Sequence, residues 1–150
     1  MSWLPKQKVV VPIDLSDRSM AVVEVAIKLV EDATHLYVIH VLPIITEYEL
    51  GMVWTDVNDA ERIARVREAI AERLSATKYS GINVEIGLGD AGHEIVDYAE
   101  SIAADLIAMP SHSRSGLTRF LIGSVAERVV RLAHCPVLVL KQHEDKHRKE

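Results

Sequence analysis

Short apolar runs rich in valine and isoleucine recur along this chain, and their spacing restricts the folds it can adopt. The runs are VVVPI (9–13), LYVIHVL (36–42), INVEI (82–86), LIAM (106–109) and PVLVL (136–140). Four of them lack strict alternation of apolar and polar residues, which is typical of strands buried on both faces. INVEI does alternate, with Asn83 and Glu85 on one side, and this pattern predicts an edge strand.

Helical patterns fill the gaps between these runs. In each of four gaps, apolar side chains recur three and four residues apart, which is the spacing of one helix face. The first of these predicted helices begins after Ser16, a suitable N-cap residue. The four stripes are Val22, Val25, Ala26 and Leu29; Ile63, Val66, Ile70 and Leu74; Ile95, Ala99 and Ile102; and Val125, Val129 and Leu132. The alternation predicts an α/β domain with a parallel sheet, right-handed crossovers and helices on both faces. Ligands bind such sheets beyond the carboxyl ends of the strands, here at 12–14, 41–43 and 109–113.

Length and charge narrow the class of protein. The 150 residues predict a single domain over residues 1–150, with a core at about 8–141 and a charged tail at 142–150. The net charge of −5 argues against a nucleic-acid partner. No uncharged run reaches the ~20 residues that cross a membrane. With Cys135 as the one cysteine and no secretory signal pattern at the start, we expect a cytoplasmic protein without disulfides.

Two short motifs match known ligand-binding patterns in sequence, but their positions in the chain do not fit those functions. GLGDAG (87–92) fits the dinucleotide-binding pattern G-x-G-x-x-G, but it follows the third strand, and the next strand ends in Pro110 rather than in an acid that could hold a ribose. A strand-to-helix turn at Gly89 and Asp90 is the simpler interpretation. HEDKH (143–147) fits the zinc pattern H-E-x-x-H, but it lies in the charged tail, so we interpret it as solvated surface.

Residues 43–58 form a long connection that carries Tyr48, Met52 and Trp54. Such a segment acts as a lid over the end of the sheet, as a surface for a partner, or as a packed loop. The sequence alone leaves all three open.

The segment SHSRSGLTRFLIGS (111–124) is the strongest candidate for a binding site. At Gly123 and Ser124 it opens into a helix, whose first amides have no intrahelical acceptors and, with the helix dipole, attract phosphate. Gly123 admits close approach, Ser124 adds a hydroxyl, and Arg114 and Arg119 supply positive charge. The alternative is a polar loop that ends in an N-cap at Ser124.

Three stretches together resemble the universal stress protein family over residues 8–141. They are VVVPIDLSDRS (9–19), GDAGHEIVDYAESIAADLIAM (89–109) and SHSRSGLTRFLIGSVAERVVRLAHCPVLVL (111–140). The resemblance implies an open five-stranded parallel sheet in the order 3-2-1-4-5, a Rossmann-like fold of the adenine-nucleotide alpha-hydrolase type, and a homodimer. Family dimers commonly pair through the last strand, here Pro136, Val137, Leu138, Val139 and Leu140, which would cover an exposed edge.

The nucleotide-binding branch of this family carries G-x2-G-x9-G-[ST] after the fourth strand. On this chain the four marked positions fall on Pro110, Ser113, Gly123 and Ser124, and the last two match. Pro110 has no amide hydrogen and a fixed φ angle. Ser113 brings a Cβ to a position where the backbone needs a left-handed turn or a close approach. The second half of the phosphate cradle is therefore intact, and the first half is altered.

The resemblance also assigns the contacts to a bound nucleotide. Those for adenine and ribose fall on Asp14 and Val41, with Pro12, Ile13 and Met109 nearby. Those for the phosphates fall on Ser113, Arg114, Gly123, Ser124 and Val125. Magnesium or manganese would accompany the phosphates of ATP without a metal site on the protein.

Three functional hypotheses follow. The first is a dimeric cytoplasmic stress-response module that binds ATP or a related adenine nucleotide and hydrolyses it slowly at most, because no general base beyond Asp14 is evident. The second is a universal stress protein that binds no nucleotide and acts through its dimer surface and 43–58 on an unknown protein partner. The third is an ATP-dependent enzyme of a related fold, but DLSDRS (14–19) lacks the glycine that such enzymes carry after the first strand.

Overall fold

The computed structural model describes residues 3–45, 58–111 and 123–141. Within these ranges strands alternate with helices. The elements are β1 (Val9–Pro12), α1 (Asp17–Ala26), the 3₁₀ helix η1 (Ala33–His35), β2 (Leu36–Leu42), α2 (Asp59–Arg73), the 3₁₀ helix η2 (Thr77–Tyr79), β3 (Asn83–Leu88), α3 (Ala91–Ser101), β4 (Leu106–Pro110), α4 (Ser124–Leu132) and β5 (Val137–Leu140). The strands agree with the five apolar runs to within two residues at each end.

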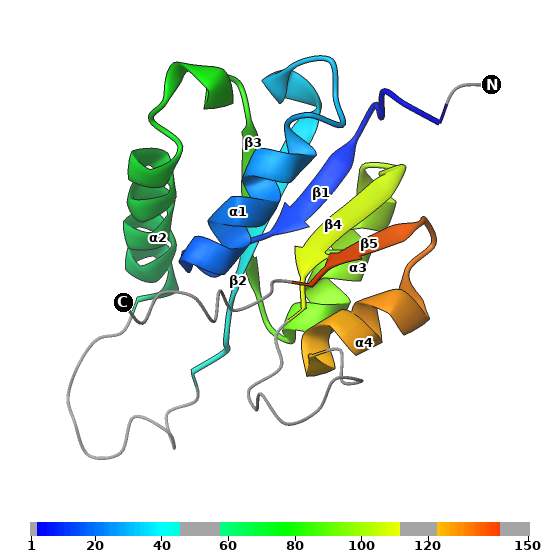
Figure 1. Ribbon diagram of the computed structural model, residues 1–150. Helices are drawn as coiled ribbons and strands as arrows, with labels where there is room; N and C mark the ends of the chain where they lie inside the picture. The colour runs from blue at the N-terminus through cyan, green and yellow to red at the C-terminus, as the bar shows by residue number, and fades with distance from the viewer. Residues whose placement is uncertain (1–2, 46–57, 112–122, 142–150) are drawn as a thin grey trace, which may run out of the picture.

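The five strands form one parallel sheet in the order β3-β2-β1-β4-β5 (Figure 1). β1 lies at its centre, because Val9 is paired with Leu36 of β2 on one side and with Leu106 of β4 on the other. β3 lies at one edge, as the alternation in its sequence predicts, and β5 lies at the other. The predicted fold class and strand order are therefore confirmed.

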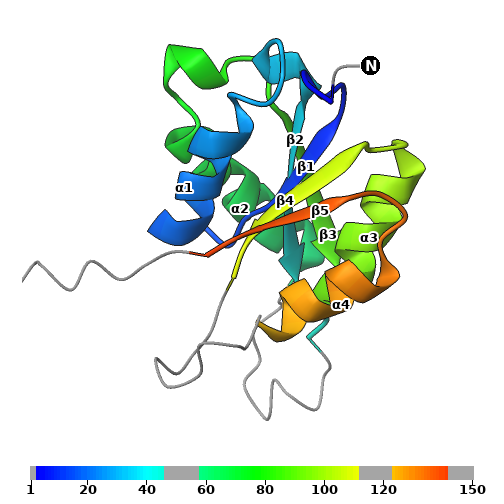
Figure 2. The same ribbon diagram turned by 45° about the vertical axis from the view of Figure 1, so that its right-hand side comes forward.

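The helices cover both faces of the sheet, with α1 and α2 on one side and α3 and α4 on the other (Figure 2). Successive side chains of a strand point to opposite faces, so each strand contributes to both cores. In β1, Val9 and Val11 pack under α1 and α2, and Val10 packs under α3 and α4. All three side chains are fully buried, which explains why the run VVV shows no alternation.

Two of the predicted helix stripes differ from the observed ones. In α1, Val25 is 39% exposed and its neighbour Val23 is fully buried, because the sheet lies against the other flank of the helix. In α4, Val125 and Leu132 are 37% and 36% exposed, and the small side chain of Ala126 faces the core instead. α4 covers the end of the sheet next to β5, where less apolar surface is available to bury it. The stripes predicted for α2 and α3 pack on the sheet as expected.

Candidate functional site

The loop after β1 holds Asp14 in a defined orientation at the carboxyl edge of the sheet. The N–H of Ile13 still donates to the carbonyl of Ile39, at 2.8 Å, so the chain leaves the sheet at the next residue. The N–H of Asp14 donates to Ser19 Oγ at 3.3 Å, and its Oδ1 accepts from the N–H of Ser16 at 2.9 Å. The exposed carboxylate is thus held by its own loop, which is suited to presenting it to a ligand.

Two contacts from the neighbouring helices hold this loop in place, one from the buried hydroxyl of Ser19 in α1 and one from Arg73 in α2. Ser19 is 1% exposed, and its hydroxyl donates to the carbonyl of Ser16 at 3.0 Å. Leu15 has a φ of 67°, a left-handed conformation that costs a residue with a Cβ about 1 kcal/mol. Its carbonyl accepts from Arg73 Nη2 at 2.9 Å, across from α2. The loop therefore has its geometry before any ligand binds.

His40 of β2 contributes a contact that the sequence analysis did not single out. Its Nδ1 lies 2.7 Å from the carbonyl oxygen of Ile13. Because a carbonyl only accepts, Nδ1 carries a proton and donates in this contact. The contact ties the end of β1 to β2. No sequence pattern could have indicated it, since the partner is a backbone atom 27 residues away.

Pro110 is compatible with the pairing of β4 and β5, because an amide hydrogen at this position would not point toward β5. Ile107 N donates to the carbonyl of Pro136 and Ser111 N to that of Leu140, both at 3.0 Å, so odd-numbered amides of β4 face β5. Position 110 therefore faces β1, whose pairing with β4 is described only as far as Val10 and Ile107. The missing amide therefore leaves the hydrogen bonds between β4 and β5 intact, and Pro110 is buried as the last residue of the strand.

The start of α4 differs from that of the other α-helices in the described ranges. Its N-cap is Gly123, which has no side chain to accept from the amides of Ser124, Val125 and Ala126. The other three helices have a capping oxygen at this position, from Ser16, Asn58 and Asp90. Ser124 is the first helical residue, so the N-cap expected at Ser124 lies one residue earlier, at Gly123. Within the part of the chain that the structure describes, no N-cap side chain occupies these first amides, which are the groups that an anion would bind.

The segment GLGDAG is a turn that brings α3 against α4, as the simpler interpretation predicts. Gly89 has a φ of 134°, which favours glycine, and Asp90 is the N-cap of α3. Asp90 Oδ2 accepts from the N–H of His93 at 3.1 Å, and its Oδ1 accepts from Arg128 Nη1 of α4 at 2.9 Å. These donors, first the backbone N–H and then the guanidinium, lower the pKa of the Asp90 carboxyl.

The remaining candidates have less support or are not described. Ser113, Arg114 and HEDKH lie outside the described residues, as does most of 43–58. Among the residues that are described, no group of His, Cys, Asp or Glu side chains could hold a metal ion. No described helix is long and apolar enough to cross a membrane.

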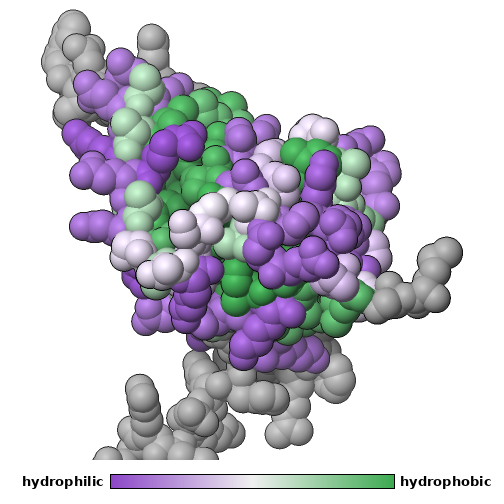
Figure 3. All heavy atoms as spheres, turned by 90° about the horizontal axis from the view of Figure 1, so that it is seen from above, coloured by the Kyte–Doolittle hydropathy of each residue, from purple (hydrophilic) through white to green (hydrophobic). Residues whose placement is uncertain are grey.

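A shallow depression lies at the opposite edge of the sheet, near the amino ends of β4 and β5. It encloses about 240 Å³ and is lined by Ala99, Glu100, Ala103, Ala104, His134 and Cys135. Burial raises the pKa of the Cys135 thiol, which argues against a reactive thiolate. Seen from this side, the surface shows apolar side chains in patches between hydrophilic ones (Figure 3). We therefore place the candidate site at the carboxyl edge.

Comparison with known proteins identifies the family. The model of the universal stress protein family matches residues 6–141. The chain belongs to the universal stress protein family. Universal stress protein MJ0531 of Methanocaldococcus jannaschii is 35% identical, and the match covers 91% of this chain and 82% of that protein. Universal stress protein YxiE of Bacillus subtilis is 28% identical, with 89% of this chain and 98% of that one covered.

Solved structures of the family share the fold. Universal stress protein UspA from Lactobacillus plantarum superposes with a TM-score of 0.68 and 28% identity, over 89% of this chain and 97% of that chain. The structure of MJ0577 gives a TM-score of 0.70 at 23% identity, over 94% and 99% of the two chains, and so supports the fold alone.

The family pattern can now be placed on the structure. Most of the residues that it assigns to a nucleotide lie on the central strands, directly after β1 or at the start of α4, namely Pro12, Ile13, Asp14, Val41, Met109, Gly123, Ser124 and Val125. Two of their side chains are buried in the cores: Ile13 packs under α1 and α2, and Met109 packs under α3 and α4. Val41 and Asp14 are at least partly exposed.

Proposed function

We propose that this universal stress protein is a dimeric cytoplasmic module that binds ATP or a related adenine nucleotide. The adenine and ribose would lie near Asp14 and Val41, and the phosphates near the start of α4. Magnesium or manganese would be held by the phosphates. The bound nucleotide would serve a regulatory or protective role, and hydrolysis is slow at most, because the sequence offers no evident general base beyond Asp14.

The observation that carries this proposal is the start of α4. Gly123 and Ser124 keep the second half of the family's phosphate pattern, and the glycine leaves the first three helical amides without an N-cap side chain. The helix dipole adds a favourable field for an anion at the same point. β4 and α4 are consecutive elements of the described chain, and β4 pairs with β1, which carries Asp14 at its end.

A related protein supports the class of ligand. One solved universal stress protein was crystallised in complex with cAMP, an adenine nucleotide, and it shares the fold with a TM-score of 0.60 at 24% identity. At this identity the likeness concerns the fold, so the ligand remains part of the proposal for this chain.

The alternative is a universal stress protein that binds a protein partner and no nucleotide. It is favoured by the departures at Pro110 and Ser113 from the family pattern. Pro110 is weaker evidence against a nucleotide than the sequence suggests, because the fold accommodates it as the last residue of β4 and its missing amide does not face β5. Ser113 lies outside the described residues.

We also propose that two copies pair through β5. This strand lies at the edge of the sheet, and all four of its residues are only partly buried. The neighbouring α4 exposes Val125, Val130 and Leu132, the second of them by 48%. An apolar, unpaired edge of this kind favours association with a second strand.

The proposed function is tested by calorimetric titration with ATP and magnesium, after native mass spectrometry has shown whether nucleotide remains bound. The test variant is Gly123→Val with Ser124→Ala, and Ser101→Ala at the exposed end of α3 is the control. Gly123 has a φ of −55°, so its backbone accepts a valine, and lost binding would reflect bulk at the phosphates. Unchanged affinity in the double variant places the site elsewhere, and no binding by the wild type favours the protein partner.

A further inference from the structure

Arg128, in the second turn of α4, contacts the beginning of α3. It follows Ser124, the first residue of α4, by four positions, or about 6 Å along the helix. Its Nη1 donates to Asp90 Oδ1 at 2.9 Å, and its Nη2 donates to His93 Nε2 at 3.1 Å. Asp90 is the N-cap of α3 and His93 lies in the first turn of that helix, so one guanidinium holds both.

Close backbone packing accompanies this contact. A Cβ built on Gly92 would lie 3.1 Å from Arg128 Cβ and 3.5 Å from its Cδ. The absence of a side chain at position 92 therefore lets the stem of Arg128 pass directly over the first turn of α3. The first turn of α3 and the second turn of α4 are therefore packed closely together, and their connection does not depend on the end of a long flexible side chain alone.

We propose that Arg128 is a positioning residue for the phosphates. By holding Asp90 and His93 it fixes the direction in which the first amides of α4 point. This inference rests on the proposed nucleotide site and adds to it the element that aligns its amides. The group that these amides would bind is the polyphosphate of an adenine nucleotide. Adenosine lacks phosphates, so it would make no contact with them.

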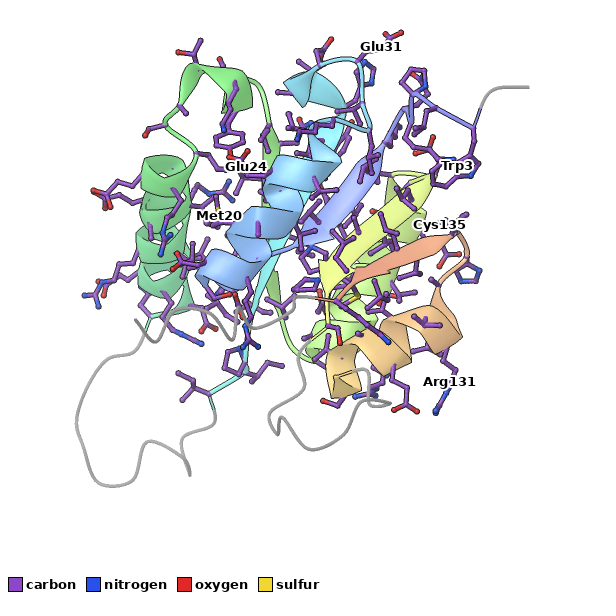
Figure 4. The ribbon with its side chains drawn as sticks, in the orientation of Figure 1. Trp3, Met20, Glu24, Glu31, Arg131 and Cys135 are labelled. Carbon is purple, nitrogen blue, oxygen red and sulfur yellow. The ribbon has the colours of Figure 1, made fainter. Side chains whose placement is uncertain are left out.

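The geometry argues against a direct contact between Arg128 and phosphate. One N–H of each terminal nitrogen donates toward α3, which directs the guanidinium to that helix, and the carboxylate of Asp90 offsets its charge locally. Arg131, one turn further along α4, offers a comparison. It pairs with Glu127 of its own helix at 2.8 Å, and its side chain points away from the domain (Figure 4). It makes no described contact with α3.

The variants separate positioning from other roles. Arg128→Ala removes both contacts to α3. Asp90→Asn keeps a good N-cap and the charge of Arg128, but it removes the ion pair. Arg131→Ala is the matched control, because it removes an arginine and an ion pair from the same helix without touching α3.

The experiment is calorimetric titration of each variant with magnesium ATP and, separately, with adenosine. We expect Arg128→Ala and Asp90→Asn to bind ATP about fivefold more weakly than the wild type, the factor that corresponds to one ordinary surface ion pair. Adenosine affinity should be unchanged in both, and Arg131→Ala should match the wild type. Equal weakening of both ligands would indicate general damage and overturn the inference. Tighter ATP binding by Asp90→Asn would indicate a direct contact of Arg128 with phosphate and would overturn it too.

A second measurement needs no nucleotide. In amide NMR spectra of the free protein, the signals of Ser124, Val125 and Ala126 should move in Arg128→Ala and Asp90→Asn and stay in place in Arg131→Ala. Unmoved signals overturn the inference while leaving the proposed function intact. If the wild type binds adenosine and ATP with equal affinity, or binds neither, the proposed phosphate site is wrong. The inference about Arg128 is then wrong as well.

Discussion

The hydroxyl of Ser19, which is almost completely buried, accepts a hydrogen bond from the backbone N–H of Asp14 at 3.3 Å and donates one to the carbonyl of Ser16 at 3.0 Å. One side chain of α1 thereby determines the course of the loop that carries the candidate adenine-binding carboxylate. This relationship makes the loop a part of the folded core and gives the first prediction.

Ser19→Ala should lower the free energy of unfolding by about 1 kcal/mol, because it removes the acceptor of the Asp14 N–H and one of the two donors to the Ser16 carbonyl, which keeps the N–H of Met20 at 3.1 Å. Nucleotide affinity should fall with it if Asp14 contacts the ligand. Denaturant unfolding and calorimetry measure the two effects. Ser101→Ala, at an exposed hydroxyl that donates to the carbonyl of Tyr98, is the control and should change little. A fully stable Ser19→Ala protein would contradict the role assigned to this hydroxyl.

Ala103→Gly should stabilise the protein by about 0.5 to 1 kcal/mol. Ala103 follows α3 with a φ of 54°, and it is exposed, so it loses no packing when the methyl is removed. The N–H of Ala104 donates to the carbonyl of Ala99 at 2.8 Å, the hydrogen bond that closes a helix through a left-handed residue. Thermal unfolding measures the gain. Ala64→Gly, at an exposed position inside α2, should instead cost about 1 kcal/mol.

Tyr98→Phe should make the protein less sensitive to alkali. Burial, with smaller contributions from Glu85 and Tyr37, raises the pKa of Tyr98 from 10.0 to about 12. The unfolded chain therefore loses this proton at lower pH than the folded one, and the stability that the neutral phenol contributes is present below pH 10 and lost as the pH rises toward 12. Urea unfolding at pH values of about 9 and 11 should show a smaller decrease for the variant than for the wild type. Equal decreases in stability for the two proteins would show that Tyr98 ionises as freely in the folded chain as in the unfolded one.

Val139→Pro should convert the proposed dimer into monomers without unfolding the chain. Ile107 N donates to the carbonyl of Pro136, so in the parallel ladder the amides of Leu138 and Leu140 face β4 and that of Val139 faces outward. Proline is tolerated at such an outward position of an edge strand. Light scattering should give half the wild-type mass, and circular dichroism should be unchanged. A folded variant of unchanged mass would place the interface away from β5.

The elements could be predicted from the sequence with good accuracy. The run LYVIHVL coincides with β2, and the alternation in INVEI placed β3 at an edge of the sheet. Ser16 caps α1 as expected. These features are local, because the backbone itself imposes the spacing of two residues in a strand and of about 3.6 in a helix.

The candidate site could be located only in part. The rule for parallel sheets places it at the carboxyl edge, and Gly123 and Ser124 do mark the start of α4. The orientation of Asp14 could not be predicted, since it depends on Ser19 in the next helix and on neighbouring elements of the sheet.

The sequence by itself therefore determined the family, the order of strands and helices, and the edge of the sheet where a ligand would bind. The tertiary structure alone decided which flank of each helix is buried, so that Val23 replaces Val25 in the core, and which polar groups meet. Asp90 and Arg128 lie 38 residues apart and touch because α3 and α4 share one face of the sheet. Periodicity is a property of a few consecutive residues, whereas such contacts depend on how whole helices pack on the sheet.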